Sequence, residues 1–192
     1  MRKELVFLLE ERSAKVMLET LLPRMLDDRI EVRLIAFEGK QDLEKRMTTR
    51  IKGYLNECAR FIVMRDQDSD PNCAALKSRL VVKCQASGKA AVSLVRIACR
   101  ELETFYLADL RAVESALGIK GLSAKQNIAK FRSPDYLVSP SHELRVLSKN
   151  RYEKISGSRE IGRYLDMDNV RSDSFRNLVQ GIKRFEAELL LL

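Results

Sequence analysis

The sequence predicts an α/β protein with a four-stranded, mostly parallel sheet, followed by a basic helical C-terminal part. An apolar strand followed by an amphipathic helix occurs four times before Gly118, and no strand-like run follows that glycine. The apolar runs are largely continuous, which is typical of parallel strands covered on both faces. We therefore expect an α/β part at residues 1–118 and a helical and loop extension at residues 119–192 packed on it.

The first half of the α/β part begins with a continuous apolar run, Leu5 to Leu9, which predicts a buried strand. Ser13 suits the N-cap of the following helix, which we expect to end near Asp27. A second strand is predicted over residues 30–37, and its initial alternation of apolar and polar residues places it nearer a sheet edge. A very polar helix over residues 42–54 follows.

The second half contains the third and fourth strands, predicted over residues 61–64 and 92–98. Between them, Pro71 suits the first position of a helix that runs to about Ser87. Asp70 precedes this proline, so we favour it as the N-cap of that helix.

The remainder of the chain is predicted to be helices and loops. One helix is expected from about residue 99 to Gly118, and an amphipathic helix capped by Asp173 or Ser174 is expected to pack back onto the domain. Between them, residues 120–163 hold 10 Lys and Arg against 4 Asp and Glu, whereas residues 1–119 hold 21 against 18. Most of the excess positive charge therefore follows the sheet.

A net charge of +8 favours a polyanionic partner, and nucleic acid, either DNA or RNA, is the leading candidate. A merely soluble basic surface is the alternative, since each basic residue taken alone is better explained as a surface charge and only the group together could hold phosphates. The residues that we expect to contact phosphates are Lys130, Arg132, Lys154, Arg159 and Arg171.

Several classes of site are excluded. The four cysteines lie far apart and the chain has one histidine, so neither a zinc site nor a disulfide scaffold is expected. There is no phosphate-binding Walker loop, dinucleotide fingerprint or nucleophilic triad motif. No apolar run approaches the length of a membrane span, so we expect a cytoplasmic protein without a membrane partner.

Acidic residues follow the first and third predicted strands. Glu10 leaves the first, and Asp66, Asp68 and Asp70 leave the third at a spacing of two. Because parallel strands end at the same edge of a sheet, we expect these side chains to converge there. Carboxylate oxygens suit Mg²⁺ or Mn²⁺, and Glu10 could serve as a ligand or as a general acid or base.

Alternatives remain for each of these acids. They could be solvated groups paired with arginines, Glu11 could point inward in place of Glu10, and Asp70 fits a helix cap better than a ligand. A calcium loop is excluded because it needs glycine where this chain has Pro71. At the start of the helix after the fourth strand, Glu101 or Glu103 could complete the metal site, as a ligand or by accepting from a backbone amide of the acidic loop. Alternatively, these acids only interact favourably with the helix dipole.

A Glu after the first strand with Asp-x-Asp after the third resembles the TOPRIM fold of topoisomerases, primases and OLD nucleases, over roughly residues 3–110. The resemblance implies a three-layer sandwich in which Glu10 is the general acid or base and Asp66 and Asp68 bind Mg²⁺. The whole chain looks closest to an uncharacterised bacterial TOPRIM-related family, by the segments around Glu10, Lys40, Asp66, Glu101 and Ser172. That resemblance implies a neighbouring ATPase of the AAA or ABC type and a role in phage defence.

The resulting hypothesis is a nuclease that cleaves nucleic-acid phosphodiesters with Mg²⁺ or Mn²⁺. The alternative is a non-enzymatic module with a degenerate metal site that binds nucleic acid or an ATPase. Phosphoester chemistry on a small nucleotide is a third hypothesis.

Overall fold

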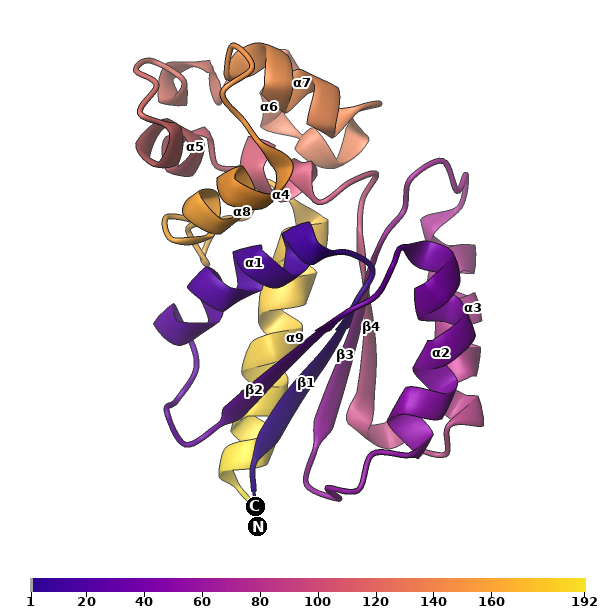
Figure 1. Cartoon of the computed structure of the whole chain (residues 1–192). Coiled ribbons are helices and arrows are strands. Elements are labelled where there is room, and N and C mark those ends of the chain that lie inside the picture. Colours follow the sequence, from indigo (N-terminus) through magenta and orange to yellow (C-terminus); the bar gives the residue numbers. More distant parts are fainter. Residues whose placement is uncertain (1) are drawn as a thin grey trace.

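The computed structural model describes residues 2–192 and contains one four-stranded parallel sheet (Figure 1). The strands are β1 (Glu4–Leu9), β2 (Glu31–Ala36), β3 (Arg60–Asp66) and β4 (Ser93–Ala98), arranged in the order β2-β1-β3-β4. Every neighbouring pair is parallel. The predicted α/β fold class is therefore confirmed, and so is the position of the second strand at an edge.

Helices cover both faces of the sheet and make a three-layer sandwich. Helices α1 (Arg12–Leu21) and α9 (Asp173–Leu190) pack on one face, and α2 (Lys40–Lys52) and α3 (Cys73–Ala86) pack on the other. Alternate residues of each strand enter opposite cores: in β1, Phe7 faces α1 and α9, whereas Leu8 faces α2 and α3. Burial on both faces explains the continuous apolar runs.

The remaining helices form a cap above the carboxyl ends of the strands (Figure 1). Its helices are α4 (Glu103–Leu107), α5 (Leu110–Leu117), α6 (Ala129–Arg132), α7 (Pro140–Leu147) and α8 (Lys154–Gly162). Short 3₁₀ turns occur at Leu22–Arg24 (η1), Ala90–Val92, Ser123–Lys125 and Pro134–Tyr136. The cap shares the core of the α1 and α9 face, because Leu144 and Ile161 belong to the same apolar cluster as Phe7.

Several predicted helix boundaries are wrong. Helix α3 begins at Cys73 with Asn72 as its N-cap, whose side chain accepts from the Ala75 amide at 2.9 Å, so neither Asp70 nor Pro71 starts it. The helix expected between residue 99 and Gly118 is two helices, because Asp109 caps a new one by accepting from the Ala112 amide. In both cases a polar side chain close in sequence satisfies the free helical amides.

The ends of the first and last helices also differ from the predictions. Ser13 lies in the first turn of α1 and Glu11 occupies the N-cap position, while α1 ends at Leu21. Ser172 caps α9 and accepts from the Phe175 amide at 3.0 Å, in place of Asp173 or Ser174. Helix α9 nevertheless packs back onto the domain as expected, against the sheet.

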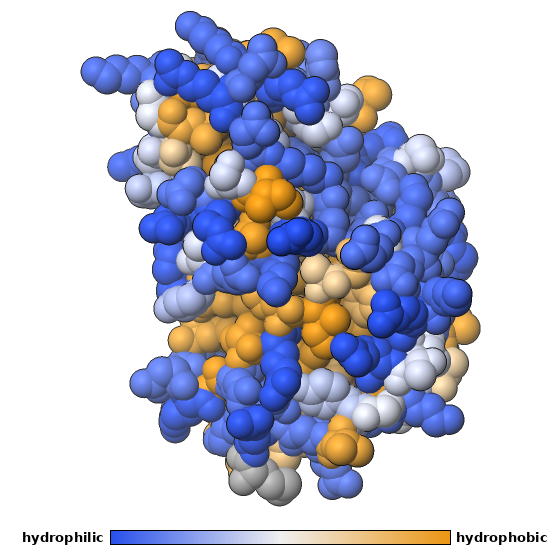
Figure 2. Space-filling view, viewed as in Figure 1, coloured by the Kyte–Doolittle hydropathy of each residue, from blue (hydrophilic) through white to orange (hydrophobic). Residues whose placement is uncertain are grey.

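One edge of the sheet is open beside α1. Apolar residues from the end of α1, the following turn and β2 line a groove of about 570 Å³ there, including Leu18, Leu26 and Val32. Figure 2 shows an apolar band in this region, and smaller apolar patches elsewhere on the same face. Among residues 2–192, no helix is long and apolar enough to cross a bilayer.

Close packing of α8 on α1 sets the position of the cap. A Cβ atom on Gly162 would lie 2.3 Å from Thr20 Oγ1 and 2.6 Å from the Met17 carbonyl oxygen, so only glycine fits. The Thr20 hydroxyl also donates to the Arg159 carbonyl oxygen of α8 at 2.9 Å. This contact brings the first residue of α8, Lys154, to the edge of the sheet where β1 ends.

We expect Gly162→Ala to lower the free energy of unfolding by about 1–3 kcal/mol, because the added methyl group overpacks the α1–α8 contact. Urea denaturation would measure the change. Ser156→Ala is the control, since Ser156 is exposed on the same helix and alanine favours helix there. Equal stability of Gly162→Ala and the wild type would contradict the packing argument.

Candidate active site

A cavity of about 490 Å³ lies at the carboxyl edge of the sheet, between the ends of β1 and β3 and the cap. Acidic side chains dominate its lining and outnumber basic ones by seven to two. The acids are Glu10, Glu11, Asp66, Asp68, Glu101, Glu103 and Glu153, and the bases are Arg145 and Lys154. So many carboxylates in one cavity repel one another and favour a bound cation.

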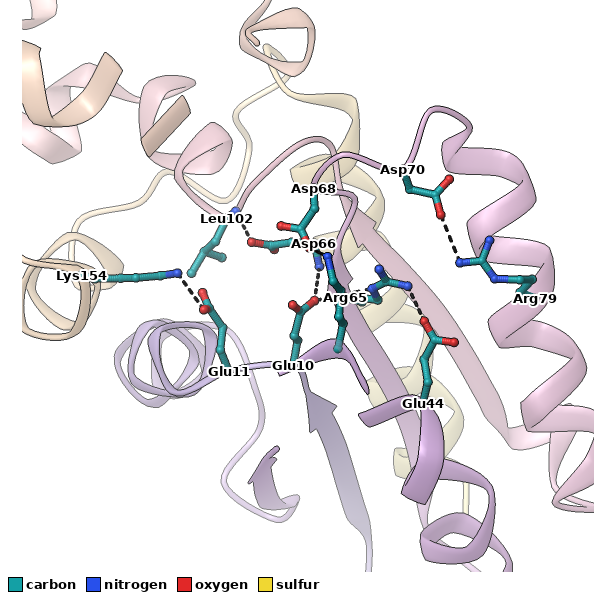
Figure 3. A network of polar contacts seen from close by, with 11 residues as sticks. Glu10, Glu11, Glu44, Arg65, Asp66, Asp68, Asp70, Arg79, Leu102 and Lys154 are labelled. Atoms are coloured by element: carbon teal, nitrogen blue, oxygen red, sulfur yellow. Dashed lines mark hydrogen bonds and ion pairs between the residues drawn. The ribbon is translucent and has the colours of Figure 1, made fainter. Parts of the chain in front are cut away.

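Parallel pairing of β1 and β3 brings Glu10 and Asp66 together, as predicted (Figure 3). The Glu10 amide donates to the Met64 carbonyl oxygen at 3.2 Å and so extends the pairing by one residue. The Glu10 carboxylate in turn accepts from the Asp66 amide at 3.1 Å. The backbone therefore fixes the place of both acids.

Asp66, like Glu103, is a buried carboxylate of the cavity that makes no ion pair with any described residue. Its side chain accepts from the Leu102 amide at 3.0 Å and makes no ion pair with any residue from 2 to 192, and the residue is 8% exposed. Burial, followed by repulsion from Glu11, Glu10 and Glu103, raises the pKa of Asp66 well above its usual range. No ion pair therefore offsets the charge of Asp66, and the nearest contribution of a cation comes from Lys154 across the same cavity.

Glu10 is also perturbed, but a cation lies near it. Burial first, and the neighbouring Asp68 second, raise the pKa of Glu10. The nearly buried Arg65 guanidinium lies 3.7 Å from the Glu10 carboxylate and is itself paired with Glu44 of α2 at 2.5 Å (Figure 3). The charge of Arg65 lowers the pKa of Glu10, but by less than burial and Asp68 raise it.

The loop after β3 is held by the loop after β4. The Asp68 amide donates to the Arg100 carbonyl oxygen at 2.7 Å, and the Gln67 amide donates to Ala98 at 2.9 Å. Asp68 and Arg100 both have positive φ, 53° and 64°, a conformation that non-glycine residues rarely adopt. Such strain persists only where surrounding contacts enforce it, and it is common at functional sites.

This loop conformation changes the role expected of Asp68. We predicted that Asp66 and Asp68 would point the same way from an extended chain, but the positive φ turns Asp68 toward Lys40, 3.0 Å away. Both acids still line the cavity. Lys40 was not among the predicted site residues, although it follows the second strand and so had to lie near the same edge.

Asp70 does not belong to the site, which corrects its prediction as a metal ligand. Its carboxylate pairs with Arg79 of α3 at 3.1 Å and accepts from the Asn72 amide at 3.3 Å. The hydrogen bond from Arg79 lowers the pKa of Asp70. In Figure 3 it lies apart from the other acids, beside α3.

Glu101 and Glu103 both line the cavity and connect it to the cap. Glu101 accepts from the Ser141 amide at 2.7 Å at the start of α7. Glu103 is 2% exposed and accepts from the Tyr152 hydroxyl at 2.9 Å, and its burial raises its pKa. Tyr152 has no local sequence pattern that would have identified it, because the cap's tertiary packing places it there.

The five basic residues expected to contact phosphates do not form one surface. Lys154 lines the acidic cavity, 2.7 Å from Glu11. Three others are engaged elsewhere: Lys130 pairs with Glu143, Arg159 pairs with Glu19, and Arg132 donates to the Asn127 carbonyl oxygen. Arg171 lines a different cavity.

The cavity offers the right atoms for a hard divalent cation but not a finished cage. Within residues 2–192, no three His, Cys, Asp or Glu side chains are arranged to hold a metal ion. The donor set nevertheless fits Mg²⁺ or Mn²⁺, because Glu10, Asp66 and Asp68 supply carboxylate oxygens and Asp66 lacks a counter-charge. Glu10 and Asp66 are the two acids that the backbone places side by side.

We expect Asp66→Asn to raise the free energy of unfolding in EDTA by about 1–3 kcal/mol at neutral pH, the usual cost of an uncompensated buried polar group. Asparagine can still accept from the Leu102 amide.

The gain should depend on pH in a defined direction. With a raised pKa, folded Asp66 binds more protons than unfolded Asp66, so wild-type stability falls as the pH rises above the ordinary aspartate pKa of about 3.9. The difference between Asp66→Asn and the wild type should therefore be small near about pH 4 and grow toward neutral pH. Urea titrations across this range would measure it, and a difference that does not change with pH would contradict the account.

The chain was compared with known proteins. No curated protein and no solved structure matches it. One family model matches residues 9–183, a span that contains every acid of the cavity. The chain therefore belongs to the family described as Domain of unknown function (DUF4276).

Proposed function

We propose that this protein is a nuclease that hydrolyses nucleic-acid phosphodiesters with Mg²⁺ or Mn²⁺ in the acidic cavity. The observation that carries the proposal is the buried carboxylate of Asp66, which lies among the acids of the cavity and makes no ion pair with any residue from 2 to 192. A structural acid of this kind would be expected to have an ion pair, whereas a metal ligand needs its charge free.

The residues of the cavity have distinct roles in this proposal. Asp66, Asp68 and Glu10 would hold the metal, and Asp68 would give up its contact with Lys40 to do so. When bound, the ion would supply positive charge for a phosphoryl oxygen and would make water a better nucleophile. Glu10 accepts or returns a proton, for which its raised pKa suits it better than an ordinary glutamate.

The basic residues of the cavity wall would contact the substrate. Lys154 and Arg145 face the same space as the acids, and they come from the cap, whereas the acids Glu10 and Asp66 come from the sheet. A phosphodiester held between a cation of the cap and the metal of the sheet would have its charge balanced on both sides. The +8 net charge supports nucleic acid as the source of that phosphodiester.

The resemblance to TOPRIM proteins supplies two parts of this proposal, a role in phage defence and an ATPase of the AAA or ABC type as partner. A cytoplasmic location is proposed because no apolar run of the sequence approaches the length of a membrane span.

A second candidate function is a non-enzymatic module that binds nucleic acid or an ATPase. The ion pair between Asp68 and Lys40 and that between Glu11 and Lys154 favour it, since they neutralise part of the site without a metal. Metal binding and cleavage assays distinguish the two candidates.

We expect Mg²⁺ or Mn²⁺ to stabilise the wild-type protein. At a free ion concentration about 100 times its Kd, the gain would be about 2.7 kcal/mol, or about 5–10 °C in Tm for a chain of this size. Asp66→Asn should abolish the shift, whereas Asp70→Asn should retain it because Asp70 lies outside the cavity. An equal shift in the wild type and Asp66→Asn would place the bound ion elsewhere.

We expect the purified protein to cleave plasmid DNA or transfer RNA when Mg²⁺ or Mn²⁺ is present, and EDTA should stop the cleavage. Glu10→Gln should lower the rate by about 100- to 10,000-fold, as for loss of a general acid or base. Asp66→Asn should lower it as severely, and Asp70→Asn is the matched control from the same loop. Absence of cleavage with either ion, also when the neighbouring ATPase is added, would rule out the nuclease.

A further inference from the structure

A second polar cavity, of about 650 Å³, lies on the cap away from the acidic one. Segments far apart in sequence form it: the η1 turn after α1, the first turn of α5, and the loop between α8 and α9. Each segment contributes one arginine, namely Arg24, Arg111 and Arg171. The three arginines are exposed at this cavity, and arginine is the residue that proteins use most readily to bind phosphate through paired hydrogen bonds.

Two of these arginines have guanidinium groups without a partner in the described part of the chain. The side chains of Arg111 and Arg171 make no hydrogen bond or ion pair with the described part of the chain, residues 2–192. Arg24 makes a single hydrogen bond, from Nη1 to the Gly162 carbonyl oxygen at 3.1 Å. Most of the donor atoms of the three guanidinium groups thus remain available to a ligand.

The acids of the cavity do not neutralise these arginines. Asp109 is 8% exposed, and its two carboxylate oxygens accept from the Ala112 amide at 3.0 Å and the Asp166 amide at 2.8 Å. Asp166 accepts from the Asp168 amide at 3.0 Å. Asp109 and Asp166 thus accept from backbone amides of α5 and of the loop after α8. Neither acid forms an ion pair with an arginine of this cavity.

The floor of the cavity is rigid. Buried Gln126 accepts from the Leu110 amide at 2.7 Å and donates to the carbonyl oxygens of Leu107 and Phe131. Buried Asn169 donates to the Ala108 carbonyl oxygen and accepts from the Arg171 amide at 2.8 Å. This network fixes the backbone that carries Arg171, so a ligand would meet a preformed site.

An aromatic ring completes the wall. Tyr164 lines the cavity and is 49% exposed, and its ring has no aromatic partner in the described structure. Nucleobases stack on such rings, and stacking of this kind tolerates any base. The cavity therefore offers partners for both ends of a nucleotide.

We infer that this second cavity binds a nucleotide, with its phosphate on Arg111 and Arg171 and its base on Tyr164. The nucleotide could be free or could be one unit of a nucleic-acid strand, since both present the same groups. Helix α8 separates the two cavities: Lys154 begins it at the acidic cavity, and Tyr164 follows its end. Its nine residues correspond to about 13 Å, so one strand could reach both. Binding here does not require hydrolysis at the acidic cavity.

Equilibrium binding in EDTA tests the inference without a contribution from metal. The probes are AMP, adenosine as its uncharged counterpart, and a short fluorescein-labelled single-stranded DNA. We expect the phosphate-bearing probes to bind and adenosine not to bind. Arg111→Ala and Arg171→Ala should each weaken binding about tenfold or more, as for loss of a charge-assisted hydrogen bond.

Three further variants make the test specific. Arg50→Ala removes an equal charge from α2 on the other face of the sheet and should leave binding unchanged. Tyr164→Ala should weaken binding. Tyr164→Phe should bind as the wild type does, because phenylalanine keeps the aromatic ring on which a base can stack. Circular dichroism would verify that each variant is folded.

Each outcome decides the inference. AMP binding that is lost in Arg111→Ala supports a free nucleotide as ligand, and DNA binding without AMP binding, lost in the same variant, supports a strand. No binding of either phosphate-bearing probe, or binding that is equal in the wild type and in Arg171→Ala, would overturn it. Asp66→Asn should bind as the wild type does, so a failure of the nuclease proposal would leave this result unaffected.

Discussion

The buried carboxylate of Asp66 is the constraint on which the rest of the site depends. It ends a central strand, it lies among other acids, and its hydrogen bond comes from a neutral amide, that of Leu102. A protein selected for stability alone would replace it with a neutral residue, because an unpaired buried charge costs free energy. The same arrangement is useful if a divalent cation binds to these carboxylates. The positive φ angles in the loops after β3 and β4 then cost free energy but keep Asp66 and Asp68 at the site.

Acids of the cavity hold the cap in position. Glu11, which follows β1, pairs with Lys154 of α8, and Glu101, in the loop after β4, accepts from the start of α7. Within the cap, Glu103 of α4 accepts from Tyr152. These acids therefore position the cap as well as lining the cavity. Close packing of α8 on α1 at Gly162 sets how near the cap can approach. The chemistry of the cavity and the stability of the cap are thus linked, and substitutions among these acids are expected to affect both.

The fold was predictable because burial on both faces gives the strands a simple pattern, and the meeting of Glu10 with Asp66 follows from parallel topology. The remainder required tertiary information. Asn72 displaced Asp70 as helix cap, since both types of side chain can accept the same amide bonds and only packing selects one. The positive φ of Asp68, which turns it toward Lys40, depends on contacts with the loop after β4. Arg24, Arg111 and Arg171 converge from three segments that no sequence pattern connects.

The central claim is that the acids of the first cavity bind a divalent cation, and a crystal structure grown with Mn²⁺ tests it most directly. Anomalous scattering at the manganese absorption edge would locate the ion independently of any activity. The account predicts a peak within coordinating distance of the Asp66 and Glu10 carboxylates, with Asp68 released from Lys40. Absence of a peak at saturating Mn²⁺, with Asp66 still bound only to the Leu102 amide, would contradict it.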